Sequence, residues 1–167
     1  MSTASSFAAP FPAPLEDPVA NAIAVLNRLL RGEIAALETY EKAVAYFAAR
    51  PPHALCTCLE SHRQRAQALR DRLDVLGGIV AEGSGAWGVF ARATEAAAAM
   101  LGHAAILRAL HEGEELGLAD YRKALPALDD DSRALVERTL LPEQEETVAR
   151  MRALCLPPGA AGAAGGA

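Results

Sequence analysis

The sequence predicts an all-α fold, and three observations lead to that prediction. The chain has 167 residues, 51% of them hydrophobic, which suits one domain with a sizeable core. Its apolar residues are mainly alanine and leucine, which favour helix, whereas β-branched residues are scarce and aromatic residues make up only 5%. Apolar residues also recur at spacings of three and four, the period of a helix that buries one face. We therefore expect a bundle of long helices.

The first half of the chain is expected to form two long helices behind an irregular tail. Residues 1–16 show no apolar period and are expected to be disordered, so the bundle should occupy 17–156. Asp17 can cap the first helix, with Pro18 at its first position, and the Pro51-Pro52 pair should end it. The second helix is expected over 53–76, because Gly77 and Gly78 follow it.

The second half is expected to repeat this plan after a crossover. A short crossover helix over about 85–101 carries Trp87 and Phe90, which either pack on the bundle or form an oligomer contact. A third helix is expected over 103–125. The fourth begins at the acidic run 129–132, ends near residue 154, and should be kinked by Pro142, which lacks a backbone donor. The Pro/Gly/Ala segment 157–167 is expected to be a disordered tail.

Polar residues interrupt the apolar face of every long helix near its midpoint. A carboxylate in a packed interior must be protonated, paired or bound to a metal. A set of carboxylates and imidazoles suits iron, manganese or zinc better than copper(I). The candidate metal ligands are Glu33, His62, His111, Glu114, Glu143 and Glu146.

An internal repeat relates the first and third helices at an offset of 81 residues. Segment 32–44 matches segment 113–125 at six of thirteen positions, and it pairs Glu33 with Glu114 and Tyr40 with Tyr121. At the same offset His62 pairs with Glu143. The repeat predicts two related helical hairpins with internal pseudo-two-fold symmetry.

These motifs resemble the ferritin-like superfamily, in particular the small uncharacterised bacterial ferritin-like domains. The resemblance covers about residues 19–156 and rests on segment 26–33 with Tyr40, on 112–114 with Tyr121, and on 140–143. It implies a four-helix bundle, with a two-metal centre in the best-known members. Such centres take a Glu from each of two helices and a Glu-x-x-His pair from each of the others. This chain departs from the scheme, because Arg65 stands where a histidine is expected and helix 4 offers Glu143-x-x-Glu146.

Two interpretations of the polar interior follow. The first is a bundle that binds iron or another divalent metal, with metal-redox or oxygen-handling chemistry. The second is a metal-free structural or stress-related interaction module, in which Arg65 and protonated histidines balance the glutamates. The axial levels place His62 about 6–9 Å from Glu33 along the bundle and nearer to Tyr40, so a compact site containing Glu33 and His62 would need a longer turn.

Composition excludes several other classes of function. The net charge of −5 argues against a nucleic-acid partner, and no apolar run is long enough to span a membrane. Three cysteines and the absence of a secretory signal favour a reduced, cytoplasmic setting. Cys56 and Cys58 should point to opposite sides of their helix. No small-molecule substrate is identifiable, and hydrolase and nucleotide-binding motifs are absent.

Overall fold

The computed structural model describes residues 17–47, 50–85 and 102–156, and these contain helices, turns and no strand. The prediction of an all-α fold is confirmed. In chain order the elements are α1 (Pro18–Tyr46), α2 (His53–Val75), α4 (His103–Ala124), the short 3-10 helix η1 (Leu125–Ala127), α5 (Asp130–Leu135), the π-helical turn η2 (Val136–Leu140) and α6 (Leu141–Cys155). The expected tails, and the expected crossover helix apart from Gly85, lie outside the described residues.

The starts of α1 and α5 and the end of α2 follow the residues that predicted them, whereas α1 ends at Tyr46, before the Pro51-Pro52 pair. The carboxylate of Asp17 accepts from the N–H of Val19 at 2.9 Å, with Pro18 in the first turn, and Asp129 caps α5 in the same way through Ser132. At the end of α2, Gly77 takes a positive φ of 69°, and the N–H of Gly78 donates to Leu73. This closes the last turn of α2, because a glycine adopts positive φ without steric cost.

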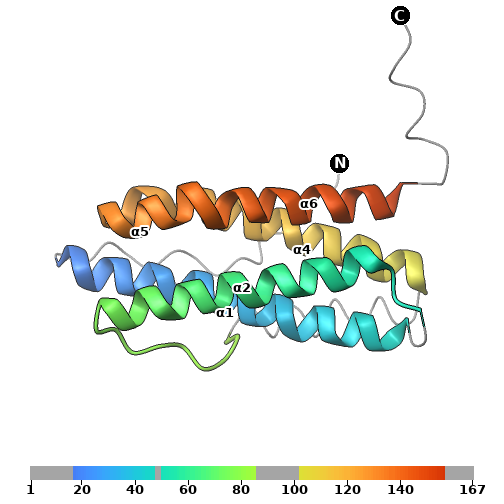
Figure 1. The fold of residues 1–167 in the computed structure, drawn as a ribbon, viewed down its shortest axis with the longest axis horizontal. Coiled ribbons are helices and arrows are strands. Elements are labelled where there is room, and N and C mark those ends of the chain that lie inside the picture. The colour runs from blue at the N-terminus through green and yellow to red at the C-terminus, as the bar shows by residue number, and fades with distance from the viewer. Residues whose placement is uncertain (1–16, 48–49, 86–101, 157–167) are drawn as a thin grey trace, which may run out of the picture.

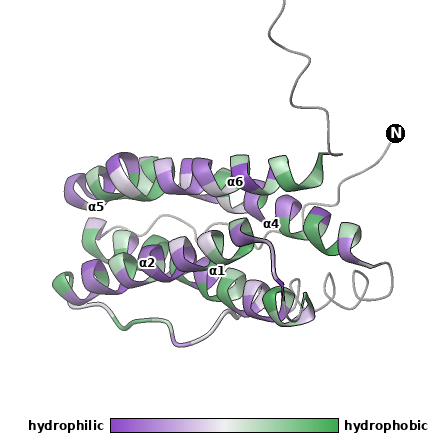
Figure 2. Cartoon of the chain, turned by 45° about the vertical axis from the view of Figure 1, so that its right-hand side comes forward, coloured by the Kyte–Doolittle hydropathy of each residue, from purple (hydrophilic) through white to green (hydrophobic). Residues whose placement is uncertain are grey.

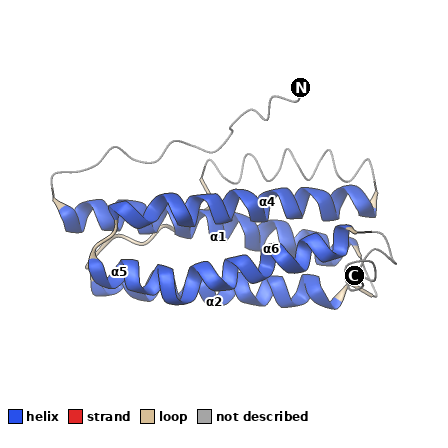
Figure 3. Cartoon of the chain, turned by 90° about the horizontal axis from the view of Figure 1, so that it is seen from above, coloured by secondary structure: helices blue, strands red, loops and turns tan. Residues whose placement is uncertain are grey.

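The long helices form a bundle of two antiparallel hairpins. α1 packs most extensively on α2, and α4 packs most extensively on α6, while α1 also contacts α4 and α2 contacts α6. Figure 1 shows that α1 and α6 run in one direction and α2 and α4 in the other. α2 therefore ends and α4 begins at opposite ends of the bundle, and Figure 3 shows the four rods lying side by side.

The loop after α2 is fastened along α1. The side-chain amide of Asn27 donates to the carbonyl of Ile79 at 2.8 Å, and its oxygen accepts from the N–H of Ala81 at 2.7 Å. Further along, the Ser84 hydroxyl donates to the carboxylate of Glu38. Asn27 thus satisfies two backbone groups of an irregular segment, and Ser84 adds a side-chain contact, so this loop is held against α1.

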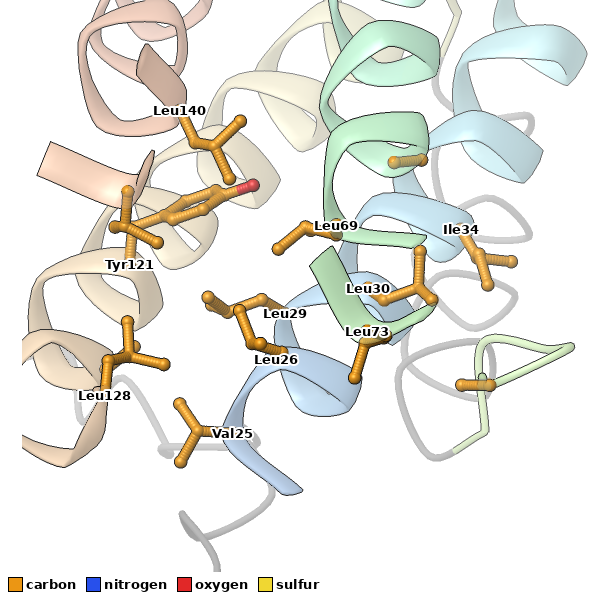
Figure 4. Packing of buried hydrophobic residues seen from close by; sticks show 14 residues of the cluster. Val25, Leu26, Leu29, Leu30, Ile34, Leu69, Leu73, Tyr121, Leu128 and Leu140 are labelled. Carbon is orange, nitrogen blue, oxygen red and sulfur yellow. The ribbon is translucent and has the colours of Figure 1, made fainter. Parts of the chain in front are cut away.

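Two apolar clusters pack the bundle, one toward each end. The larger joins residues of α1, α2, α4 and the α5–α6 rod; it includes Leu26, Leu30, Leu69, Leu73, Val136 and Leu140. The second includes Leu55, Leu59, Leu110 and Met151. Figure 2 shows hydrophobic and hydrophilic residues alternating along each helix, and Figure 4 shows Tyr121 beside Leu140 among the apolar side chains of the larger cluster. Between these clusters lies a polar layer.

The last helical rod is irregular where Pro142 enters it. Pro142 has no N–H to donate one turn back, and the turn before it widens, so that the N–H of Leu141 donates to Val136. The π-helical turn lies directly before Pro142, the residue at which a kink is expected. Because the wider turn holds one more residue, it changes which residues beyond it face the interior.

Candidate functional site

Buried polar side chains from all four rods meet in the layer between the two apolar clusters. α1 contributes Glu33 and α4 contributes Glu114. α2 contributes His62 and Arg65, and α6 contributes Gln144 and Thr147. Each of these six residues is at most 4% exposed. We call this set, together with Tyr40 and Tyr121, the ionic centre.

His62 lies between the two buried carboxylates. Its Nδ1 is 2.7 Å from Glu33 Oε2, and its Nε2 is 2.9 Å from Glu114 Oε1. Burial alone would lower the pKa of His62, but the negative charges of Glu114 and Glu33 outweigh it and raise this pKa to about 9. His62 is therefore an imidazolium at neutral pH and donates to both glutamates.

Arg65 supplies the second positive charge. Its side chain is 0% exposed, and its Nε donates to Glu33 Oε1 at 3.0 Å. Its terminal nitrogens donate to Ser61 Oγ at 2.7 Å and to Gln144 Oε1 at 2.8 Å. One of them also lies 2.7 Å from His62 Nδ1, where only a neutral ring could accept. Since carboxylates flank both ring nitrogens, the imidazolium form is favoured and the proton of Nδ1 goes to Glu33.

The two glutamates are held in their charged form. Burial raises the pKa of Glu33, but the positive charges of Arg65 and His62 lower it by more, so that the resulting pKa is about 2. Burial likewise raises the pKa of Glu114, and His62 outweighs this, so that the net shift is downward. Two carboxylates, one guanidinium and one imidazolium give no net formal charge, so the attraction between opposite charges offsets the cost of removing them from water.

Hydrogen bonds to the glutamates cross between the two hairpins. The hydroxyl of Tyr40 on α1 donates to Glu114 Oε1 at 2.5 Å, and the hydroxyl of Tyr121 on α4 donates to Glu33 Oε1 at 2.7 Å. Burial and the adjacent carboxylate raise the pKa of each tyrosine well above its usual value, so both stay protonated donors. The result is a continuous hydrogen-bonded chain in the order Tyr121, Glu33, His62, Glu114 and Tyr40.

The other oxygen of Glu114 is satisfied from α6. Its Oε2 accepts from Gln144 Nε2 and from Thr147 Oγ1, both at 2.7 Å. Every carboxylate oxygen of the centre therefore accepts at least one hydrogen bond from a protein side chain. In a medium of low dielectric such complete pairing strengthens each contact, whereas any unpaired group would be costly.

Three of the six sequence-predicted ligands are brought together and three are not. Glu33, His62 and Glu114 form the middle of the ionic centre. His111 is half-buried on α4, with its Nε2 3.6 Å from Glu115 of the same helix. Glu146 is exposed and pairs with Arg150 at 3.1 Å, while Glu143 is half-buried.

The expected positions of Glu143 and Glu146 were wrong because of the π-helical turn. Counting three residues beyond Leu140 on a regular helix gives Glu143, but Gln144, four residues on, is the side chain that reaches the centre. Glu143 and Glu146 instead line a surface groove between α2 and α6 with His53, Cys56 and Glu60. Helical spacing did not identify Gln144. Pro142, two residues before it, is the sequence feature that indicates a possible irregular turn and hence a change in which residues face the interior.

The expected axial gap between Glu33 and His62 does not separate them. The side chains are long enough, together with a 2.7 Å hydrogen bond, to cover an offset of ~6–9 Å between backbones. The placement of His62 near Tyr40 is confirmed, since their ring centroids are 4.9 Å apart. The prediction for the cysteines is confirmed as well, because Cys56 is exposed and Cys58 is buried.

The donor set does not fit a two-metal centre of the Glu and Glu-x-x-His type. At the paired positions three residues apart, α2 presents His62 and Arg65, and α6 presents Gln144 and Thr147. A metal ligand must be deprotonated, yet both ring nitrogens of His62 are directed at carboxylates. Within the described part of the chain no group of three or more His, Cys, Asp or Glu side chains is arranged to hold a metal ion.

A cavity of about 90 Å³ adjoins the ionic centre between α1 and α4. All five residues of the Tyr–Glu–His–Glu–Tyr chain line it, and most of its lining surface is carbon. One wall carries small residues of both helices: Gly32, Ala35, Ala36, Ala109, Gly113 and Gly117. Arg28 and Asp120, which form a buried ion pair at 2.9 Å, also line it.

Comparison of the chain with protein-family models, with curated proteins and with solved structures gives no match. Separately, none of the helices in the described ranges is both long enough and apolar enough to cross a membrane.

Proposed function

We propose that this chain is a metal-independent helical bundle, a structural or interaction module whose centre is held by an ionic network. The observation that carries the proposal is the place of Arg65. Its guanidinium is fully buried and bonded to Glu33, at the helix position where a metal-binding bundle of this type has a ligand. Together with His62, it supplies the positive charge that a metal would otherwise bring.

We also propose that the bundle is ferritin-like and built from two related hairpins. Reciprocity of the contacts supports this: Tyr40 donates to Glu114, and Tyr121, 81 residues after Tyr40, donates to Glu33, which precedes Glu114 by the same number. His62 and Arg65 on α2 correspond to Gln144 and Thr147 on α6 at an offset of 82. The extra residue agrees with the π-helical turn that precedes α6.

The proposed setting is the cytoplasm, and the proposed partners are proteins, including a second copy of this chain, rather than nucleic acid or a membrane. The three cysteines are free thiols in the described structure, and the net charge is −5. A reducing compartment suits free thiols, and an acidic surface repels phosphate backbones.

Metal titration tests the metal-independent function. The purified full chain is dialysed anaerobically against iron(II), manganese(II) and zinc(II), and bound metal is measured by mass spectrometry alongside the melting temperature. We expect well under one equivalent of metal and no shift in melting temperature. One or more equivalents bound by the native chain and lost in Glu114→Gln would overturn the proposal in favour of a carboxylate–histidine metal site.

A gain-of-function variant provides the matched control. Replacing the two pairs on α2 and α6 by Glu-x-x-His, that is His62→Glu with Arg65→His and Gln144→Glu with Thr147→His, creates the ligand set of a two-metal bundle. We expect this variant to bind up to two divalent ions and to gain thermal stability from them. Metal binding by the variant alone would show that the assay detects such a site and that the native residues are what prevent it.

A further inference from the structure

The α1–α4 cavity is framed by two glycines that the helices themselves do not require. Gly32 and Gly113 lie within α1 and α4, immediately before Glu33 and Glu114. Glycine inside a helix costs about 1 kcal/mol relative to alanine. A Cβ added at either position would meet no atom within 4 Å, so no close contact in the described structure excludes alanine there. Both glycines widen the same cavity.

The surroundings of the cavity restrict the chemistry of an occupant. The polar groups on one side already pair with each other, since both carboxylates and both ring nitrogens of His62 have protein partners. A charged occupant would lose its hydration and find no free counter-charge in this neutral centre, which is costly. Arg28 and Asp120, which also line the cavity, pair with each other, and most of the lining surface is carbon. This lining favours an occupant of low polarity.

Size sets the second restriction. Apolar cavities of about 150 Å³ in other proteins stay dry and take up benzene or xenon. The present cavity, at about 90 Å³, is smaller than these but exceeds the ~30 Å³ that one water occupies in the liquid. It has room for a few heavy atoms.

We propose that the cavity between α1 and α4 is a binding site for a small uncharged molecule of low polarity, of a size between xenon and benzene. The small residues of α1 and α4, a lining that is mostly carbon and the hydrogen-bonded chain from Tyr121 to Tyr40 together make a pocket with convergent polar groups, the usual form of a small-molecule site. The proposal can fail without affecting the metal-independent function, because xenon probes the space beside Glu33, His62 and Glu114, whereas the metal titration probes those side chains as ligands.

Xenon is the probe that tests this site. The isotope-labelled full chain is titrated with xenon under pressure, and amide shifts are followed by NMR. We expect saturable shifts confined to residues around the cavity, with Gly32, Gly113 and Gly117 among the largest. Shifts that do not saturate, or that spread over the whole bundle, would overturn the proposal. So would contacts from other protein side chains to the Cα protons of Gly32 and Gly113, because the cavity would then be filled by the protein itself.

Filling the cavity provides the variant arm. Gly113→Leu should weaken xenon binding at least tenfold, while the control Ala45→Leu, on the exposed face of α1, should leave it unchanged. If Gly113→Leu does not fold, Gly113→Ala serves instead, since its Cβ meets no described atom within 4 Å, and it should weaken binding by a smaller factor. If a folded Gly113 variant bound xenon with unchanged affinity, xenon would be binding outside this cavity and the proposal would be wrong.

Discussion

The two hairpins contribute differently to the ionic centre. Each offers one glutamate and one tyrosine at corresponding positions, but α2 adds the cations His62 and Arg65, whereas α6 adds the neutral donors Gln144 and Thr147. All positive charge therefore comes from one helix and must balance glutamates on two others. The comparison shows that buried glutamates in one bundle can be stabilised by positive charges from one helix, α2, and by neutral hydrogen-bond donors from another, α6.

The largest expected effect is the loss of charge from α2. Arg65→Met leaves Glu33 buried with less compensation, and breaking a buried ion pair from one side costs about 3–5 kcal/mol. We expect the free energy of unfolding to fall by that amount in denaturant titrations. Arg63→Met is the matched control on the same helix, because Arg63 is half-exposed and pairs with exposed Glu41, and its loss should change stability by less than about 0.5 kcal/mol. Equal effects of the two changes would show that the centre does not depend on buried charge.

Measuring the free energy of unfolding as a function of pH separates the contribution of the negative Glu33 from that of the positive His62. The pKa of Glu33 is lowered to about 2, so its contribution is full above the unfolded value near 4.5 and is lost as pH falls toward 2. The pKa of His62 is raised to about 9, so its contribution is full below 6.5 and is lost as pH rises through 9. Each of these two pKa shifts corresponds to a contribution of about 3 kcal/mol to the free energy of unfolding. We expect stability to be greatest between about pH 4.5 and 6.5.

The alkaline arm of that profile has its own control. His62→Gln removes the titrating ring, so its melting temperature should fall less than that of the native chain between pH 6.5 and 9. An identical alkaline slope in the two proteins would show that His62 is not the group that loses its proton. Measurement by circular dichroism at constant ionic strength keeps surface charges from dominating the comparison.

Changes on α6 should cost less than the loss of Arg65. Gln144→Ala removes a donor to Glu114 and an acceptor for Arg65, and hydrogen bonds to charged groups contribute about 1.5–3 kcal/mol. We expect a loss of that size in denaturant titrations, and about 1–2 kcal/mol for Thr147→Val, which keeps the shape and removes one hydroxyl. If Gln144→Ala destabilised the protein more than Arg65→Met, the division between a charged and a neutral side would be wrong.

The smallest expected effect is a gain in stability at the cavity. Gly32→Ala and Gly113→Ala should each stabilise the bundle by up to about 1 kcal/mol, because alanine favours helix and its Cβ meets no atom of the described residues within 4 Å. Thermal unfolding of the two single variants checks this. Gly117→Ala is the contrasting case, since its Cβ would lie 3.1 Å from Gln144 Nε2, and we expect a smaller gain or a loss there.

The sequence by itself determined the helices and, for α1 and α2, which face is buried. Helix spacing identified Glu33, His62 and Glu114 as interior residues, and the capping residues Asp17 and Asp129 fixed where two helices begin. Periodicity and capping are local properties, so they can be read from neighbouring residues. The same reasoning located the paired tyrosines, Tyr40 and Tyr121, on the core faces.

Only the tertiary structure decided which interior residues meet. Local spacing directed Glu143 inward, but the π-helical turn before Pro142 rotated α6 so that Gln144 faces Glu114 instead. Likewise the exchange of tyrosine donors between α1 and α4, and the placement of Arg65 against Glu33, depend on how separate helices are set against each other. One extra residue in a turn rotates the following helix, so that a neighbouring side chain faces the interior. The rotation of a helix is set by its packing against distant segments rather than by its own residues.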